Sequence, residues 1–253
     1  MSFLPRFSVP KRPSPSIPEG HRVYAIGDVH GEAALFESLM SIIERDSVNR
    51  GSAITSIVLL GDVIDRGRRS ADLLEILMRA EQDRLTILKG NHEAAFVAGY
   101  RGNERAFDFW LRHGGDTTLQ SFGVENTDNR EVEDLMEAGQ TVISKVVIDW
   151  LDALPMTKII GDYFFVHAGI RPGVDLEHQS ADDLLWIREP FISSRRNHGK
   201  VVVHGHTVEA SPVRLGGRRI GIDTGAYRTG VLTALGLQGS DQWTLQTPTP
   251  GVA

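Results

Sequence analysis

Short apolar segments alternate with amphipathic segments along the first third of the chain. Each apolar segment is followed within two residues by a glycine, as is typical of buried strands that end in a tight loop. The segments between them carry apolar residues at helical spacing, for example Leu35, Leu39 and Ile43. The pattern predicts strands at 23–26, 57–60 and 85–88 and helices at 32–45 and 71–80, with Ser70 as the N-cap of the second helix.

The pattern changes after residue 93. Residues 94–111 and 130–154 are mostly helical in pattern, so we expect a helical insertion over residues 94–158 that covers part of a functional site. Strand-like apolar segments then return. Because no long helix separates them, they predict a second, antiparallel or mixed sheet packed on the first. These segments are 163–166, 201–203, 219–222, 231–237 and 243–245.

Composition narrows the classes of protein that fit this pattern. The 253 residues suffice for one large α/β domain, and we expect a single domain over residues 20–247, preceded by a flexible, proline-rich arm over residues 1–19. A net charge of −6 lacks the basic excess of a binder of nucleic-acid polymers or membrane surfaces. No apolar run is long enough for a membrane span or a signal peptide, and the lack of cysteine fits a cytoplasmic location.

Five glycine-containing segments follow predicted strands and carry side chains that can bind metals. Each supplies a carboxylate, an imidazole or an amide oxygen at a strand end, where ligands bind in sheets of this kind. Because the chain has no cysteine, any metal must be held by nitrogen and oxygen atoms. The segments are Gly27-Asp28-Val29-His30-Gly31, Gly61-Asp62-Val63-Ile64-Asp65-Arg66-Gly67, Gly90-Asn91-His92-Glu93, His167-Ala168-Gly169 and His204-Gly205-His206.

These side chains predict two divalent metal ions that share one carboxylate. Asp62 can bridge the ions because a carboxylate has two oxygens. The predicted ligands are Asp28, His30 and Asp62 for the first ion, and Asp62, Asn91, His167 and His204 for the second. His206 follows His204 by two residues, so it is expected to point the same way and could also reach a metal. Mn²⁺ is the expected ion, and Fe²⁺ and Zn²⁺ are alternatives that accept the same ligands.

Residues next to these ligands complete a site for a phosphate ester. Arg66 and Arg188 are expected to bind phosphate oxygens through forked hydrogen bonds, and Asn91 is expected to contact the phosphate as well. His92 adjoins a ligand without being needed as one. Paired with Asp65, it would be held protonated and would give a proton to the leaving oxygen. The pattern predicts hydrolysis by a metal-bridging hydroxide, without a covalent intermediate.

Each motif has an ordinary structural explanation when it is taken alone. Asp28 and Asp62 could be helix N-caps, and Asn91 could stabilise a turn. His167 and His204 could be core histidines with satisfied hydrogen bonds. The presence of all five segments in one chain favours the metal interpretation.

In order and spacing, these motifs resemble the metallophosphoesterase superfamily, and within it the prokaryotic serine/threonine phosphatases of the phosphoprotein phosphatase branch. The resemblance covers residues 23–237. It implies an α/β fold of four layers, a β-sandwich of two mixed sheets flanked by helices (the calcineurin-like metallophosphoesterase fold). It also implies that Arg66 and Arg188 bind phosphate and that Asp65 and His92 form an acid pair.

Two features refine the resemblance. Eukaryotic members carry a Ser-Ala-Pro-Asn-Tyr-Cys loop, whereas residues 221–227 here read Gly-Ile-Asp-Thr-Gly-Ala-Tyr, which is similar to the short prokaryotic forms. The His167-Ala168-Gly169 segment also resembles the symmetrical dinucleoside tetraphosphate hydrolases. Those enzymes commonly lack the second aspartate of the Asp-Arg-Gly motif, which is Asp65 here, so its presence favours phosphomonoester chemistry.

Three functional hypotheses follow. The first is a metal-dependent phosphomonoesterase, a serine/threonine protein phosphatase whose partner is a phosphorylated protein or a small phosphoester. The second is a diadenosine polyphosphate hydrolase of the symmetrical type. The third is a catalytically silent metal-binding module that recruits partners. Retention of the expected ligands and of the acid pair argues against the third hypothesis.

Overall fold

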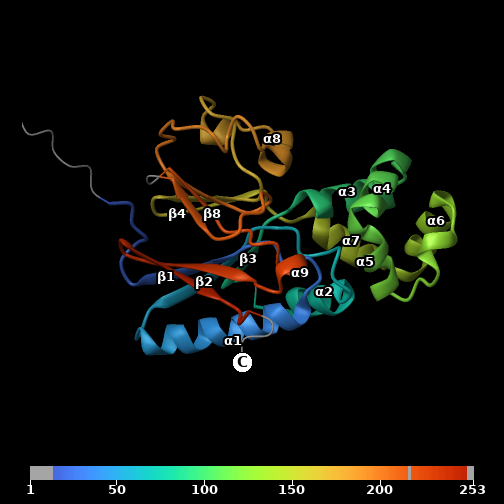
Figure 1. The fold of residues 1–253 in the computed structure, drawn as a ribbon, viewed down its shortest axis with the longest axis horizontal. Helices are drawn as coiled ribbons and strands as arrows, with labels where there is room; N and C mark the ends of the chain where they lie inside the picture. Colours follow the sequence, from blue (N-terminus) through green and yellow to red (C-terminus); the bar gives the residue numbers. More distant parts are fainter. Residues whose placement is uncertain (1–13, 82, 216–217, 250–253) are drawn as a thin grey trace, which may run out of the picture.

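Two mixed five-stranded sheets form the centre of the computed structural model, which describes residues 14–81, 83–215 and 218–249 (Figure 1). The first sheet has the order β10 (Asp241–Gln246), β9 (Thr233–Gln238), β1 (His21–Ile26), β2 (Ile54–Leu59) and β3 (Leu85–Ile87). Strands β1, β2 and β3 are parallel, whereas β9 is antiparallel to β1 and to β10. The carboxyl ends of the three parallel strands therefore meet at one edge of the sheet.

The second sheet contains three further parallel strands. Its order is β4 (Thr157–Ile160), β5 (Tyr163–Val166), β6 (Val201–His204), β8 (Arg219–Gly221) and β7 (Val213–Leu215). Strands β5, β6 and β8 are parallel, and β4 and β7 pair antiparallel at the edges.

The last two strands differ from the expectation. Segments 231–237 and 243–245 were predicted to belong to the second sheet, but they form β9 and β10 of the first. The physical reason is that β1 is almost fully buried, and a buried strand needs a hydrogen-bonding partner on both sides. Strand β9 supplies the partner on the side opposite β2.

Successive side chains of a strand point to opposite faces of its sheet. One face of each sheet therefore packs against the other sheet, and the opposite face packs against helices. Val23 and Ala25 of β1 pack with Phe165 of β5 and Val203 of β6 in a core between the two sheets. The alternate residues of β1, such as Tyr24, face the opposite way, toward helices α1 (Ala33–Asn49) and α2 (Ser70–Arg79). In Figure 1, α1 covers the outer face of the first sheet.

The outer face of the second sheet has its own cover. Phe164 and Val166 of β5 pack with Leu184 of α8 (Ala181–Trp186) and with Phe191 in a third core cluster. Helices, sheet, sheet and helix thus form the four layers (Figure 1). The predicted α/β sandwich of two mixed sheets flanked by helices is confirmed.

The expected insertion, residues 94–158, lies beyond the carboxyl ends of the strands and is mainly helical up to β4 (Figure 1). It starts within α3, and Phe96 of α3 stacks on the buried Trp110 of α4 with ring centroids 4.4 Å apart. Its elements are α3 (Asn91–Tyr100), α4 (Glu104–Trp110), η1 (Leu111–Gly115), α5 (Asp116–Ser121), η2 (Thr127–Asn129), α6 (Val132–Val142) and α7 (Lys145–Asp152). We refer to residues 94–152 as the helical segment.

The start of the described chain packs against the domain. Residues 1–13 of the expected arm lie outside the described residues, whereas residues 14–19 are described. Ile17 is buried and its amide donates to the carbonyl of Gly239, while the carbonyl of Ser16 accepts from the amide of Asp162. The arm is therefore fixed to both sheets from Ser16 onward. Within the described residues, none of the helices combines the length and the apolar character needed to cross a bilayer.

Candidate metal centre

Loops after five strands converge at the edge where the two sheets meet. They carry Asp28 after β1, Asp62 after β2, Asn91 after β3, His167 after β5 and His206 after β6. Asp28, Asp62, Asn91 and His206 line a pocket of about 390 Å³, and the buried His167 lies beside it, with Nε2 2.8 Å from Asn91 Oδ1. The expectation that distant motifs lie together is met for these positions.

The loop backbones are unusual at the functional positions. Of the six described residues other than glycine with positive φ angles, five lie in these loops, with φ of 49–74°, namely His30, Asp62, Asp65, Arg66 and His206. Such conformations cost of order 1–3 kcal/mol each and are concentrated at functional sites, where the surrounding structure enforces them. A glycine is required where the loops touch, because a Cβ on Gly90 would lie 2.2 Å from Asp62 Oδ1.

Asp62 lies at the centre of the arrangement. Its Oδ2 atom is 3.6 Å from His30 Nε2, 3.5 Å from His167 Nε2 and 3.8 Å from His92 Nε2. Its Oδ1 atom accepts a hydrogen bond from the amide of His92. Asp62 belongs to both groups of side chains whose ligand atoms lie within 4.8 Å of one another, and it is therefore the residue that could bridge two ions.

The first group of side chains contains His30. Its Nδ1 donates to the carbonyl of Ile64 at 2.9 Å, so the lone pair of the neutral ring is on Nε2, which faces Asp62. Burial lowers the pKa of His30 to about 3, which keeps the ring neutral and able to bind a metal. Arg66 Nη1 donates to the same Nε2 atom at 2.9 Å, so this guanidinium must move when Nε2 binds an ion.

Asp28 is a buried carboxyl that lines the same pocket, although it is not one of the three members of the first group, which are His30, Asp62 and His92. Its carboxylate accepts a hydrogen bond from the amide of His206 at 3.0 Å. Burial raises the pKa of Asp28 well above its ordinary value, and the neighbouring carboxylates of Asp223 and Asp62 raise it further. Crowded buried carboxylates beside a neutral imidazole are a donor set that fits a divalent cation, because the cation would neutralise their repulsion.

The second group combines Asp62 with His167 and His206. His167 Nδ1 donates to the carbonyl of Leu60 at 2.9 Å, which leaves Nε2 directed at Asn91 and Asp62. His206 Nε2 is buried and lacks a hydrogen-bond partner among the described residues, and burial lowers the pKa of the ring to about 3. An unpartnered buried nitrogen on a neutral ring, in one group with a carboxylate, fits a metal ligand.

The structure does not bring the predicted ligand His204 into either group. Its Nδ1 donates to the carbonyl of Gly205 at 3.0 Å, and its Nε2 accepts from Arg219 at 3.2 Å. Both ring nitrogens are therefore occupied within the protein, and the ring packs against Phe191. His206 instead lies in the second group, where His204 was expected. The reason is that β6 ends at His204 and the chain turns at His206, where φ is +60°.

We expect His206→Ala to lower the affinity for the second metal ion by at least about 100-fold, since changes to the outer partners of a ligand already cost roughly 10–100-fold. His204→Asn should lower the melting temperature, because it removes the buried partner of Arg219 Nη1 and leaves that guanidinium only its bond to the carbonyl of Ile192 among the described residues, but it should retain bound metal. Metal content after dialysis against Mn²⁺ distinguishes the two variants. Metal loss in a folded His204→Asn protein, with retention in His206→Ala, would restore His204 as the ligand.

The predicted acid pair is formed. His92 Nδ1 lies 2.6 Å from Asp65 Oδ2, and both side chains are buried. Burial alone would lower the pKa of His92, but the carboxylates of Asp62 and Asp65 outweigh it and raise the pKa to about 9. The Nε2 atom of His92 faces the pocket, 3.1 Å from Arg66 Nη2. Because a guanidinium only donates, His92 Nε2 can hold a proton at the pocket surface once Arg66 moves away, as it must when His30 binds an ion.

Glu93 has a role that the sequence patterns did not indicate. Its buried carboxylate accepts hydrogen bonds from the amides of Asp62 at 2.9 Å, Val63 at 2.9 Å and Gly90 at 2.8 Å. One side chain thus fixes the loop after β2 to the loop after β3. The signal in the sequence is the Gly-Asn-His-Glu motif itself, which places a carboxylate three residues after Gly90, the N-cap of α3.

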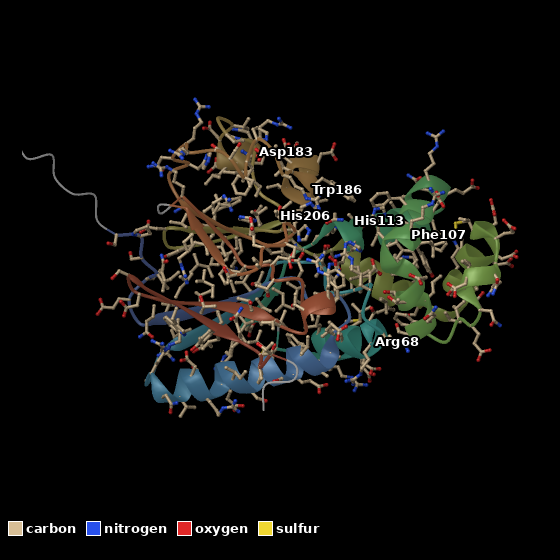
Figure 2. The ribbon with its side chains drawn as sticks, viewed as in Figure 1. Arg68, Phe107, His113, Asp183, Trp186 and His206 are labelled. Atoms are coloured by element: carbon tan, nitrogen blue, oxygen red, sulfur yellow. The ribbon has the colours of Figure 1, made fainter. Side chains whose placement is uncertain are left out.

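The cationic and aromatic wall of the pocket comes from four separate segments. Arg66 and the exposed Arg188 both line it, as was expected. Tyr227, which was not expected, lies under the Arg66 guanidinium, with Cζ 4.5 Å from the ring centroid. Figure 2 shows Trp186, His206 and His113 near one another, where α8 faces the helical segment, and Phe109 contacts the Trp186 ring edge-on with ring centroids 5.4 Å apart.

The solved structures that share this fold are named as several different kinds of enzyme. The chain is 20% identical to a candidate diadenosine tetraphosphatase, with a TM-score of 0.64 over 93% of this chain and 99% of that one. It is 18% identical to a cold-active protein-tyrosine phosphatase of a psychrophilic Shewanella species (TM-score 0.53, 91% and 83% covered). A Saccharomyces cerevisiae protein serine/threonine phosphatase is 13% identical (TM-score 0.53, 95% and 86% covered). At these identities the similarity establishes the fold.

The family is established by the sequence itself. Residues 21–228 match the profile of the family described as calcineurin-like phosphoesterases. The matched range contains all five motif segments and both groups of side chains that could hold a metal ion. The chain therefore belongs to the calcineurin-like metallophosphoesterases, a family of metal-dependent phosphoester hydrolases.

Proposed function

We propose that the protein is a two-metal phosphomonoesterase of the phosphoprotein phosphatase branch, acting on phosphoserine or phosphothreonine in proteins or on small phosphoesters. The observation that carries the proposal is the buried Asp65–His92 pair, which lies at one pocket with Asp62 and the neutral imidazoles of His30 and His206. A pair of this kind is suited to protonating an alcohol that leaves from phosphorus. The proposed single domain over residues 20–247 includes the helical segment.

The structure supports a revised set of ligands. We assign the first ion to Asp28, His30 and Asp62, and the second to Asp62, Asn91, His167 and His206. Nitrogen and oxygen donors of this mixture favour Mn²⁺, with Fe²⁺ and Zn²⁺ as alternatives. When bound, two such ions supply positive charge to the phosphate oxygens and an activated water molecule as nucleophile.

The protein's own residues bind the phosphate and deliver the proton. Arg66 and Arg188 orient the phosphate oxygens, and Tyr227 keeps the Arg66 guanidinium over its ring. His92 transfers its Nε2 proton to the alcohol oxygen while the bond from phosphorus to that oxygen breaks. Asp65 holds the opposite ring nitrogen at 2.6 Å and keeps the imidazole oriented. The products are the free alcohol and inorganic phosphate.

A second candidate is a symmetrical diadenosine polyphosphate hydrolase. The observation in its favour is the aromatic pair Phe109 and Trp186 at the pocket, both more than one third exposed, since partly exposed rings can stack on a nucleobase. The similarity in fold to a candidate diadenosine tetraphosphatase agrees with this choice. The presence of Asp65 favours the phosphomonoesterase.

The test is a comparison of substrates under one set of conditions. We expect Mn²⁺-dependent release of phosphate from a phosphoserine peptide and from para-nitrophenyl phosphate, with rates that fall to background after chelation and return when Mn²⁺ is added. Diadenosine tetraphosphate is expected to be cleaved more slowly, by kcat/KM. A preference for the dinucleotide would select the second candidate. Unchanged rates after complete metal removal would exclude metal-dependent hydrolysis.

A further inference from the structure

We propose that Thr118, on α5 of the helical segment, is a positioning residue that holds the Asp65 carboxylate in the orientation needed for proton transfer by His92. The inference rests on the proposed function, since it assigns a supporting residue to the same acid pair. Thr118 lies 53 residues beyond Asp65 in the chain and outside all five motif segments.

The two oxygens of the Asp65 carboxylate accept hydrogen bonds from different partners. Oδ2 accepts from His92 Nδ1 at 2.6 Å, and Oδ1 accepts from Thr118 Oγ1 at 2.7 Å. Asp65 and Thr118 are both fully buried, so water does not compete for these oxygens. With one oxygen held by Thr118, the carboxylate cannot rotate without breaking a buried hydrogen bond, and the His92 ring is fixed as a result.

A second contact ties the same hydroxyl to the backbone of Asp65. The amide of Asp65 donates to Thr118 Oγ1 and to Ser70 Oγ, each at 3.0 Å, and the two hydroxyl oxygens are 3.0 Å apart. A hydroxyl has one proton and a carboxylate is the stronger acceptor, so we assign the Thr118 proton to Asp65. Asp65 has φ of +74°, and these bonds support that otherwise unfavourable backbone.

This network explains why Ser70 does not cap α2 as predicted. The residue before the helix is Arg69, and the Ser70 hydroxyl is turned toward Asp65 and Thr118 instead. The sequence places a good capping residue at the start of the helix, but the buried amide of Asp65 needs an acceptor more than the exposed helix end does.

The helical segment also holds the phosphate-binding arginine. The amide of Arg66 donates to the carbonyl of Gly114 at 3.1 Å, and a Cβ on Gly114 would lie 2.8 Å from Arg66 Cγ. Two consecutive residues of the loop after β2, Asp65 and Arg66, therefore take their positions from contacts with residues 114–118. The carboxylate that orients the proton donor and the arginine that binds phosphate are thus both held by the helical segment, outside the sheets.

The experiment compares Thr118→Val, which removes the hydroxyl at nearly constant shape, with Thr118→Ser, which keeps it. The Mn²⁺-loaded full chain is assayed with phenyl phosphate, whose leaving group needs a proton, and with para-nitrophenyl phosphate, whose leaving group needs one far less. We expect Thr118→Val to lower kcat for phenyl phosphate by about 10–100-fold and kcat for para-nitrophenyl phosphate by less than about threefold. Thr118→Ser should restore most of the loss.

Thr141→Val provides the matched control, because Thr141 is exposed on α6 and, among the described residues, its hydroxyl bonds only to the carbonyl of Glu137 in the same helix. It should behave as wild type. If Thr118→Val does not fold, Thr118→Cys replaces the hydroxyl with a weaker donor and should show the same selective loss. Bound Mn²⁺ and melting temperature are measured for every variant.

Two outcomes would overturn the inference. An equal fall with both substrates, or a Thr118→Ser variant as impaired as Thr118→Val, would reduce Thr118 to a structural contact of α5. Neither result would affect the proposed function, because wild type would still hydrolyse both esters. A wild-type protein that binds Mn²⁺ but hydrolyses neither ester would instead refute the proposed function, and the inference with it.

Discussion

Asp62→Asn is expected to abolish most metal binding and to lower kcat/KM for para-nitrophenyl phosphate by at least about 1000-fold. The reason is that Asp62 Oδ2 lies 3.5–3.8 Å from three imidazole nitrogens and is shared by both groups of ligands. Asparagine has the same shape but no charge and a single acceptor oxygen, so it cannot bridge two cations. Loss of about 4 kcal/mol of transition-state stabilisation by metal corresponds to this factor.

The variant is chosen so that the fold persists. The asparagine oxygen can still accept from the amide of His92, as Asp62 Oδ1 does, and the backbone amide at position 62 still reaches Glu93. Asp128→Asn is the control, because it makes the same chemical change on an exposed residue. Bound metal is measured by elemental analysis and folding by circular dichroism. Full metal content in a folded Asp62→Asn protein would contradict the bridging assignment.

His92→Asn is expected to lower kcat by about 100- to 10,000-fold while bound metal stays near the wild-type level. The substitution removes the proton held at Nε2 but leaves the adjacent Asn91 and its contact with His167 in place. The loss should be greatest for phenyl phosphate and smallest for para-nitrophenyl phosphate, because a better leaving group depends less on a proton. Steady-state kinetics with both esters, together with elemental analysis, test the prediction.

Measuring both activity and metal content of His92→Asn distinguishes proton donation by His92 from metal binding by His92. Its Nε2 atom is 3.8 Å from Asp62 Oδ2, and it lies in a group of possible metal ligands with His30 and Asp62. If His92 bound metal, His92→Asn would lose metal in proportion to activity. Asp65→Asn serves as a second probe, since it should weaken proton transfer through the His92 ring without altering any atom that is assigned to a metal.

The sequence was most informative at the ends of parallel strands. Asp28, Asp62 and Asn91 follow apolar segments that are recognisable as strands, and parallel strands align their carboxyl ends whatever the details of packing. Their convergence therefore follows from topology alone. The pairing of His92 with Asp65 could also be anticipated, because both residues lie within a few positions of those ends.

The sequence predicted the site less well where the direction of a side chain depends on a single backbone angle, or where its position depends on contacts with distant parts of the chain. His204 and His206 were expected to point the same way, as alternate residues of a strand do, but the strand ends at His204 and the backbone turns at His206. Thr118 and Tyr227 reach the site from segments whose packing is set by long-range contacts. No local pattern marks them, because a threonine on α5 or a tyrosine on the short helix α9 (Ala226–Thr229) resembles such residues on many other helices.

The position of β1 between β2 and β9 has a consequence for how the protein is made. Ribosomes release the amino-terminal part first, so the loops with Asp28, Asp62 and Asn91 emerge long before β9 and β10 are translated. Until then one side of β1 lacks its hydrogen-bonding neighbour, and unpaired apolar edges invite association between nascent chains. Newly synthesised molecules thus complete the first sheet only after β9 and β10 have emerged, and a fragment that stops before residue 233 exposes an unpaired edge of β1 that favours aggregation.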